Sequence, residues 1–394
     1  MSRRYDLDWV RVAAFGVLIC YHVGMYYVSW DWHVKSPFAS TALEPWMFLS
    51  APWRLSLLFF IAGVATAFLA DRQPGGFMAA RSRRLLLPLL FGMLVVVTPQ
   101  AYYEVLDSSY PGGYHDGYLA FWGRYLAADD SFCDDDGCLD LPTWNHLWFV
   151  AYLWVYTLLL WGLRRGLAVP LAGLGARLQR WGSGFAVLVM PALFLAIVRV
   201  LLVGRFESTH GLVDDWYNHA QYLPLFLLGH ALARAEAVWQ RIEQLRWAAL
   251  ATALPCYLLL AWYFASFTET QPAPDWLRMT QRFAWGVNQW ATIVAILGFA
   301  RRHLHRDSAA LRYLSGAVFP VYILHQTVIV VLAYNLRPAA LPPWLEGPLL
   351  VIATFVTCFV GYELIRRVAW LRPLFGLTMR AGSPALTVAS PASP

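Results

Sequence analysis

Lysine and charge are what this sequence has least of. Lys35 is the single lysine among 394 residues, and 14% of the residues are charged, whereas a soluble domain contains about 25%. Together with 59% hydrophobic residues, this excludes a disordered, fibrous, coiled-coil or nucleic-acid-dominated protein, in spite of a net charge of +6. An internal repeat, a glycine-rich nucleotide loop and a Cys/His zinc spacing are also missing. We therefore predict neither a metal nor a tightly bound cofactor.

The sequence contains long apolar stretches with few charged residues. A helix needs roughly 20 apolar residues to cross about 30 Å of hydrocarbon. Ten stretches approach that length, at residues 9–30, 46–70, 85–103, 146–161, 185–203, 221–233, 247–267, 282–300, 314–336 and 348–365. The predicted fold class is an all-α integral membrane protein, a bundle of about ten transmembrane helices.

The positive charge, almost all of it arginine, is unevenly distributed. With ten spans, 21 of the 30 basic residues fall on the side of the two termini and five on the opposite side. Cytoplasmic loops carry the excess of positive residues in membrane proteins. We expect both termini to be cytoplasmic, in a bacterial-type inner membrane. The membrane domain is predicted over residues 1–367, and residues 368–394 are expected to form a cytoplasmic tail with a disordered end.

The longest outer loop, about residues 104–145, is acidic. It carries eight aspartates against one arginine, Arg124, and it contains Cys133 and Cys138. Two cysteines five positions apart in an oxidising compartment favour a local disulfide. A Ca²⁺ site on the aspartates 134–136 is the alternative, although the spacing of an EF-hand is absent.

Ionisable side chains inside a bilayer cost at least about 2.5 kcal/mol each, so they are candidates for function. In the first span, Arg11 and His22 lie eleven positions apart, which places them about 20° apart on a helical wheel. Asp8 lies about 60° from Arg11 on the same wheel. A histidine in a bundle can equally be satisfied by a neighbouring carbonyl, but the shared stripe favours a catalytic role for His22 and Arg11.

Arg81 and Arg84 precede the third span. Positive residues flank most inner helix ends, so the simplest interpretation is topological. The two side chains are nevertheless three positions apart and would point the same way on a helix. Paired guanidinium groups suit a phosphate-rich ligand that arrives from the cytosol.

Three further residues are candidate substrate or oxyanion groups. Arg54 in the second span lies at about the depth of His22, with snorkelling or helix–helix bonding as the alternative. His146 begins the fourth span beside two tryptophans that equally fit an interfacial belt. His325 falls at mid-membrane in the ninth span, where an unpaired imidazole is difficult to explain as lipid-facing.

These motifs resemble a known family. Arg11, ten intervening residues and His22 resemble the first-helix hallmark of the membrane acyltransferase-3 family, and residues 77–88, with their paired arginines, resemble its second motif. Residues 32–36, 146–149 and 319–326 resemble the glucan biosynthesis protein C-like branch of that family. The resemblance runs over nearly the whole chain.

The resemblance implies an O-acyltransferase that moves a succinyl or acetyl group from cytoplasmic acyl-CoA to a hydroxyl of a periplasmic or cell-surface glycan. It implies that His22 is the essential histidine, Arg11 its motif partner, and Arg81 with Arg84 the donor-side arginines. His22 would act as general base or as covalent acyl carrier, and Arg11 would orient it or anchor the donor. Arg54 would stabilise the oxyanion or bind the free carboxylate of a succinyl group.

Two other classes of protein stay open at this stage. A transporter or exporter of a glycan or lipid-linked substrate also needs buried charges and about ten spans. A membrane glycosyltransferase would need acidic groups near its outer face, where the aspartates 134–136 are the candidates. The expected partners of the acyltransferase are acyl-CoA, a carbohydrate acceptor and the bilayer, without nucleic acid.

Overall fold

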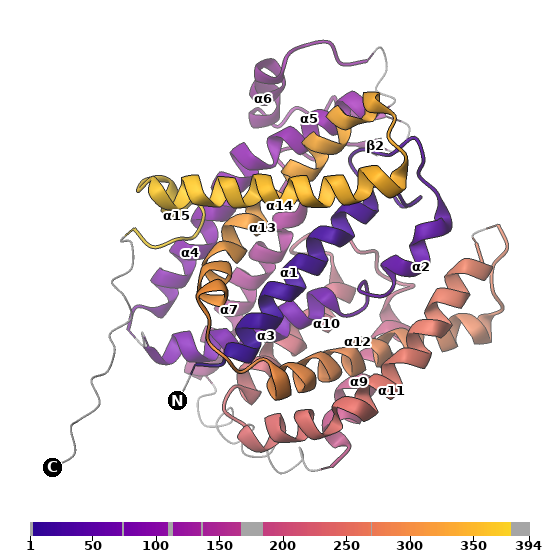
Figure 1. Ribbon diagram of the computed structural model, residues 1–394, viewed down its shortest axis with the longest axis vertical. Coiled ribbons are helices and arrows are strands. Elements are labelled where there is room, and N and C mark those ends of the chain that lie inside the picture. The colour runs from indigo at the N-terminus through magenta and orange to yellow at the C-terminus, as the bar shows by residue number, and fades with distance from the viewer. Residues whose placement is uncertain are drawn as a thin grey trace.

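Helices make up most of the described chain in the computed structural model, which describes residues 3–72, 75–108, 113–134, 137–166, 184–268 and 270–379. Each of the ten predicted spans coincides with a helix (Figure 1). The long helices are α1 Tyr5–Met25, α3 Arg54–Arg72, α4 Phe77–Phe91 continued by α5 Thr98–Asp107, α7 Trp148–Gly166, α9 Ala186–Leu202, α10 Trp216–Leu232, α11 Glu236–Ser266, α12 Asp275–His303, α13 Ala309–Leu336 and α14 Pro343–Arg367.

The short elements lie between these helices. They are the 3₁₀ turns η1 Thr41–Leu43, η3 Asn145–Leu147 and η4 Arg337–Ala339, the π-helical turn η2 Gly92–Val96, the helices α2 Glu44–Met47, α6 Tyr118–Leu126 and α15 Leu371–Leu374, and the strands β1 Cys133–Asp134 and β2 Gly137–Cys138. The two strands pair antiparallel as a hairpin.

Eight of the described helical segments are long and apolar enough to cross a membrane. Helix α9 is apolar but shorter, and α10 has 17 residues. Exposed apolar side chains recur at helical spacing on α11 and α14, as expected for surfaces that face lipid. The all-α membrane fold is therefore confirmed, while the number of ten spans stays a prediction.

Helix α1 runs through the bundle and packs against α3, α12, α13 and α14. Close packing elsewhere depends on small residues, as is usual between membrane helices. A Cβ atom on Gly63 of α3 would lie 2.0 Å from the carbonyl oxygen of Phe226, and one on Gly229 of α10 would lie 2.1 Å from that of Phe60. The reciprocal glycines bring the α3 and α10 backbones together.

The third predicted span is interrupted by the π-helical turn η2. The backbone N–H of Val97 bonds the carbonyl of Gly92 at 2.8 Å, five residues back. The carbonyl of Val96 accepts a hydrogen bond from the Thr327 hydroxyl, and Gln100 donates to that hydroxyl at 2.7 Å. The irregular turn thus couples the start of α5 to the middle of α13. π-Helical turns often mark functional sites.

The predicted outer loop folds over one end of the bundle. Its aromatic side chains form a small hydrophobic cluster with α5, which includes Tyr114, Phe121, Tyr125 and Phe132. A disulfide joins Cys133 to Cys138 across the hairpin, as favoured from the sequence. Of the alternative Ca²⁺ run, residues 135 and 136 lie outside the described part of the chain.

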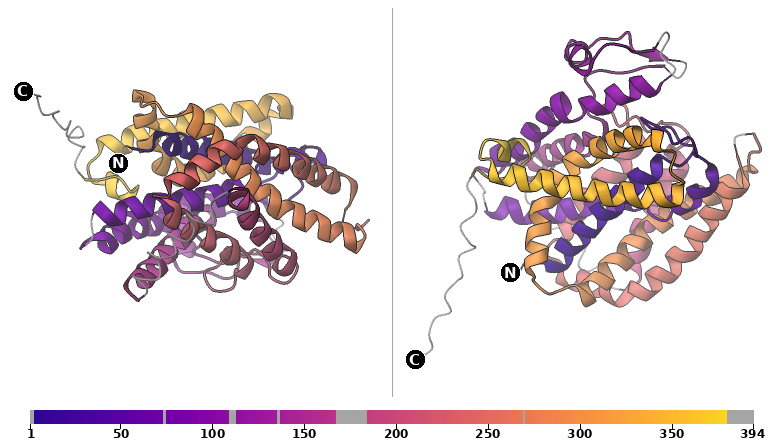
Figure 2. Two further views of the ribbon diagram at one scale, coloured as in Figure 1. Left: turned by 90° about the horizontal axis from the view of Figure 1, so that it is seen from below. Right: turned by 45° about the horizontal axis from the view of Figure 1, so that its top comes forward.

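The first described residues and the end of α14 lie at the same end of the bundle, at the left in Figure 1, and both views in Figure 2 agree. This arrangement is consistent with both termini on the same side of the membrane. That this side is the cytoplasm stays a prediction. Beyond the predicted end of the membrane domain at 367, α15 packs against α4, and Gly376 approaches Phe319 closely. Residues 380–394 of the predicted tail are outside the described residues.

Candidate active site

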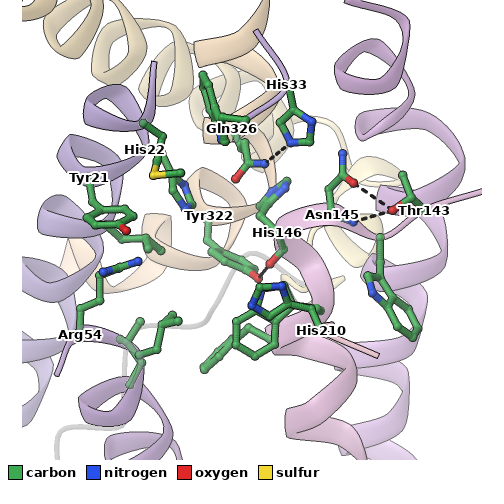
Figure 3. A pocket seen from close by; sticks show the side chains of 18 of the residues that line it. Tyr21, His22, His33, Arg54, Thr143, Asn145, His146, His210, Tyr322 and Gln326 are labelled. Atoms are coloured by element: carbon green, nitrogen blue, oxygen red, sulfur yellow. Dashed lines mark hydrogen bonds between the residues drawn. The ribbon is translucent and has the colours of Figure 1, made fainter. Parts of the chain in front are cut away.

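A cavity of about 430 Å³, here called the histidine cavity, opens between α1, α3, α7 and α13. Tyr21, His22 and Arg54 line one side of it, and Thr143, Asn145 and His146 line another (Figure 3). The remaining residues that line it are Leu18, Met25, Asp31, Trp32, His33, Leu55, Leu58, Trp144, Trp148, Phe149, Thr209, His210, Tyr322 and Gln326.

The contacts of His325 determine which ring nitrogen of a neutral His22 carries the hydrogen. Nδ1 of His325 lies 2.6 Å from the carbonyl oxygen of Tyr322, which only accepts, so Nδ1 carries the hydrogen. Nε2 of a neutral His325 then accepts the hydrogen of Nδ1 of His22, 2.8 Å away. Nε2 of His22 is left with a lone pair, and it has no hydrogen-bond partner within the described ranges.

His146 is held differently. Its Nε2–H donates to the carbonyl of Ile323 at 3.2 Å, and its Nδ1 lies 3.4 Å from the amide nitrogen of Gln100. Its ring is edge-on to that of His325, with centroids 5.0 Å apart. His146 therefore packs against His325. Since both of its ring nitrogens have partners, neither is free for a reaction.

His33 is a further residue of the site that was not predicted from the sequence, although it lies in one of the motifs, residues 32–36. Nδ1 of His33 donates to the Glu104 carboxylate at 2.6 Å, and the Gln326 amide lies 2.8 Å from its Nε2. Burial has the largest single effect and lowers the pKa of His33, but the charge and hydrogen bond of Glu104, together with the charge of Asp31, outweigh it and raise the pKa above its ordinary value. The signal in the sequence that could have indicated this pair is Glu104, a single glutamate directly after the predicted span 85–103.

Arg54 contributes an uncompensated charge to the histidine cavity. Its side chain is 7% exposed, and its guanidinium carbon lies 3.3 Å from the centre of the Tyr21 ring. Nε and Nη1 are buried without a hydrogen-bond partner among the described residues. A buried cation is costly without a partner, so the cavity is suited to an anionic group of a substrate.

The second group of predicted residues lines a separate cavity of about 310 Å³, the arginine cavity, which contains Arg11, Arg81 and Arg84. Arg11 lies 3.5 Å from Asp8, and Nε of Arg11 and Nε of Arg81 are buried without a partner in the described structure. Three guanidinium groups with so few acceptors favour a ligand that carries several phosphates.

A thin apolar wall separates the two cavities. Leu58 of α3 and Phe149 of α7 line both of them, and both side chains are buried. Arg11 and His22 lie on either side of this wall on the same helix, about 16 Å apart at 1.5 Å rise per residue. The two ends of the Arg11–His22 motif thus belong to different chambers.

The structure therefore divides the predicted residues into two groups. His22, His146 and Arg54 line the histidine cavity, where His22 is bonded to His325. Arg11 lies with Arg81 and Arg84 at the arginine cavity. His325, not Arg11, is the hydrogen-bond partner of His22. Within the described ranges, no three His, Cys, Asp or Glu side chains are placed to hold a metal ion.

The profile of the acyltransferase domain family matches residues 4–363. The chain belongs to this acyltransferase family. The match confirms both the resemblance drawn from the motifs and the predicted enzyme class, an O-acyltransferase.

Curated relatives of this acyltransferase cover nearly its whole length. The chain is 24% identical to "Glucans biosynthesis protein C" of Escherichia coli (strain K12), over 95% of this chain and 94% of that protein. The protein of the same name from Shigella dysenteriae serotype 1 (strain Sd197) is equally similar, at 24% identity with the same coverage. No solved structure matches the acyltransferase significantly.

Proposed function

We propose that this protein moves an acyl group, succinyl or acetyl, from cytoplasmic acyl-CoA to a hydroxyl of a periplasmic or cell-surface glycan. It would do so as a multi-pass protein of a bacterial-type inner membrane, with both termini in the cytoplasm. One observation carries the proposal: an unprotonated Nε2 of His22 lines a cavity that touches an arginine-rich cavity across a single apolar wall. The name of the 24% identical relatives supports a glucan as the acceptor.

The arginine cavity is the proposed donor site. Arg81 and Arg84, three residues apart on α4, would bind the phosphates of CoA, and Arg11 would anchor the same group from α1. The acyl thioester would then extend past Leu58 and Phe149 toward His22. The distance of about 16 Å along α1 leaves room for an extended arm between the phosphates and the reacting carbon.

His22 is the proposed general base. Its Nε2 takes the proton of the acceptor hydroxyl, the hydroxyl oxygen forms a bond to the thioester carbon, and the carbon–sulfur bond breaks. The departing thiolate of CoA takes the proton back from Nε2. A covalent acyl-imidazole is the alternative: Nε2 attacks the thioester carbon and CoA leaves as the thiolate, and the acceptor hydroxyl oxygen then takes the acyl group from Nε2 while its proton passes to the thiolate. In both routes His325 accepts from Nδ1 of His22 and fixes the orientation of the ring.

Arg54 is the proposed binding group for the free carboxylate of a succinyl donor. Its guanidinium is buried, lines the histidine cavity and has no carboxylate partner in the described structure, which favours a contact with the carboxylate of a substrate. This role favours succinyl over acetyl as the transferred group. Stabilisation of the oxyanion is the other role open to Arg54.

The test is mass spectrometry of glycans from a bacterial host that lacks its own acyltransferases of this family. The host would express the wild type, His22→Ala or, as a matched control, His305→Ala. His305 is an exposed histidine that is distant in sequence from His22. We expect an acyl mass increment on periplasmic glucan or surface polysaccharide with the wild type and the control only. An increment that persists with His22→Ala would refute the mechanism. If wild-type protein is inserted in the membrane and no increment is found, a glycan is not the acceptor, and another acceptor or a transport function would have to be tested.

A further inference from the structure

A third cavity lies beside the histidine cavity, on the side of the disulfide hairpin. This hairpin cavity has a volume of about 490 Å³, and polar groups make up most of its wall. It shares Asp31, Trp32 and His33 with the histidine cavity. The rest of its wall comes from Lys35, from the end of α5 and from the hairpin, at Glu104, Val105, Asp107, Ser108, Phe132, Cys133, Gly137, Cys138 and Leu139.

Most charged side chains around the hairpin cavity already have hydrogen-bond partners within the protein. The ammonium group of Lys35 donates to the carbonyls of Met25 and Trp30 at 2.8 and 2.7 Å. Asp107 forms an ion pair with Arg337 and accepts the backbone N–H of Lys35. Glu104 is bonded to His33, as described above.

Asp31 and Trp32 are the side chains left available. The carboxylate of Asp31 is exposed and has no hydrogen-bond partner in the described part of the chain, and the half-buried indole of Trp32 borders both cavities. The cavity thus offers hydrogen-bond acceptors and one flat apolar surface. The wall carries three carboxylates, Asp31, Glu104 and Asp107, against one ammonium group, that of Lys35, and the imidazole of His33, a balance that disfavours an anion.

A ligand that fits must donate hydrogen bonds, carry no negative charge and present an apolar face. Sugar units meet all three conditions, since hydroxyl groups donate to carboxylates and the C–H face of a pyranose packs on an aromatic ring. We propose that the hairpin cavity binds the glycan units next to the one that is acylated. Trp32 packs on a sugar face, and Asp31 accepts hydrogen bonds from its hydroxyls.

The position of His33 links this binding site to the reaction. His33 borders both cavities, and its partner Gln326 follows His325 directly in α13. A glycan in the hairpin cavity would therefore pass its next unit along His33 toward Nε2 of His22. The proposal rests on the proposed function, because it assumes that the acceptor is a glycan.

The test measures acceptor binding apart from transfer. Full-length protein in nanodiscs would carry Trp32→Ala, Trp32→Phe or Asp31→Asn. Matched controls would be Trp344→Ala and Asp116→Asn, which change exposed residues outside the three cavities. The acceptor would be the periplasmic glucan fraction of Escherichia coli. Calorimetry on a His22→Ala background gives affinity without turnover.

We expect Trp32→Ala and Asp31→Asn to weaken glucan binding and to raise the acceptor KM about tenfold, as for truncated anchor residues elsewhere. Trp32→Phe should retain most of the affinity, and the donor KM should stay unchanged in all variants. Unaltered glucan affinity in both Trp32→Ala and Asp31→Asn would overturn the proposal. Glucan binding without any acyl transfer by the wild type would instead reject the proposed function and leave the binding site intact.

Discussion

Nδ1 of His22 and Nε2 of His325 lie 2.8 Å apart, and His325 is in turn bonded to the carbonyl of Tyr322. This chain of contacts sets which nitrogen of His22 carries the hydrogen. We predict that His325→Ala lowers kcat about 100-fold, the upper part of what positioning of a base contributes. Glutamine can place an acceptor near the same nitrogen, so His325→Gln should recover part of the activity.

The measurement for His325 is kcat, KM and the pH profile of each variant with purified protein. A structural role alone would change the amount of folded protein without changing the pH profile of what remains. Equal rates in His325→Ala, His325→Gln and the wild type would contradict the positioning role.

Arg54→Ala should change donor choice. If Arg54 binds the free carboxylate of succinyl, its loss removes a charged contact that acetyl does not make. We expect the kcat/KM for succinyl-CoA to fall about 100-fold, with a much smaller change for acetyl-CoA. Equal losses with the two donors would assign Arg54 to the oxyanion instead, as both donors form one.

Arg84→Ala should act mainly on donor binding. It removes one of three guanidinium groups from the arginine cavity, so we expect the Kd for CoA to rise about tenfold with little change in acceptor KM. Calorimetry with CoA measures this directly. Arg302→Ala, which alters an exposed arginine outside that cavity, is the matched control. Unchanged CoA affinity in Arg84→Ala would remove the cavity from the donor site.

Leu58 and Phe149 should limit the size of the transferred group. Truncation of either side chain would join the two cavities and admit water and longer acyl chains. We predict faster hydrolysis of acyl-CoA in the absence of acceptor, and transfer of longer acyl groups, for Leu58→Ala and Phe149→Leu. A wild-type hydrolysis rate and donor range in both folded variants would show that these side chains do not separate the chambers.

The pair His33–Glu104 should make stability depend on pH. The pKa of His33 is raised in the folded protein, so the pair's stabilisation is complete below the unfolded pKa of about 6.5 and is lost as pH rises through the folded pKa. Glu104→Gln removes the carboxylate and should flatten this dependence. Thermal unfolding midpoints across that pH range test it. A parallel pH dependence in both proteins would mean that other groups dominate.

Much of the fold was predictable because apolar runs long enough to cross a membrane form helices whatever their partners are. The disulfide was predictable too, because Cys133 and Cys138 are close in sequence. The pair Arg81 and Arg84 was predictable from helical spacing alone, and the structure places both at one cavity.

The division of the site was not predictable. Arg11 and His22 share a stripe of α1, but the side chains from α3 and α7 that separate them come from distant segments. The pairing of His33 with Glu104 joins residues 71 positions apart, and helical periodicity carries no information about such contacts. The bond between His22 and His325 spans 303 positions for the same reason.

The most direct test of the central claim uses proteoliposomes loaded with periplasmic glucan, with radiolabelled acyl-CoA added outside. Donor and acceptor then meet only through the protein. We expect labelled glucan inside vesicles with the wild type and none with His22→Ala, while His22→Ala still binds CoA. Labelled glucan at the wild-type rate with His22→Ala, or none with correctly inserted wild type, would contradict the central claim.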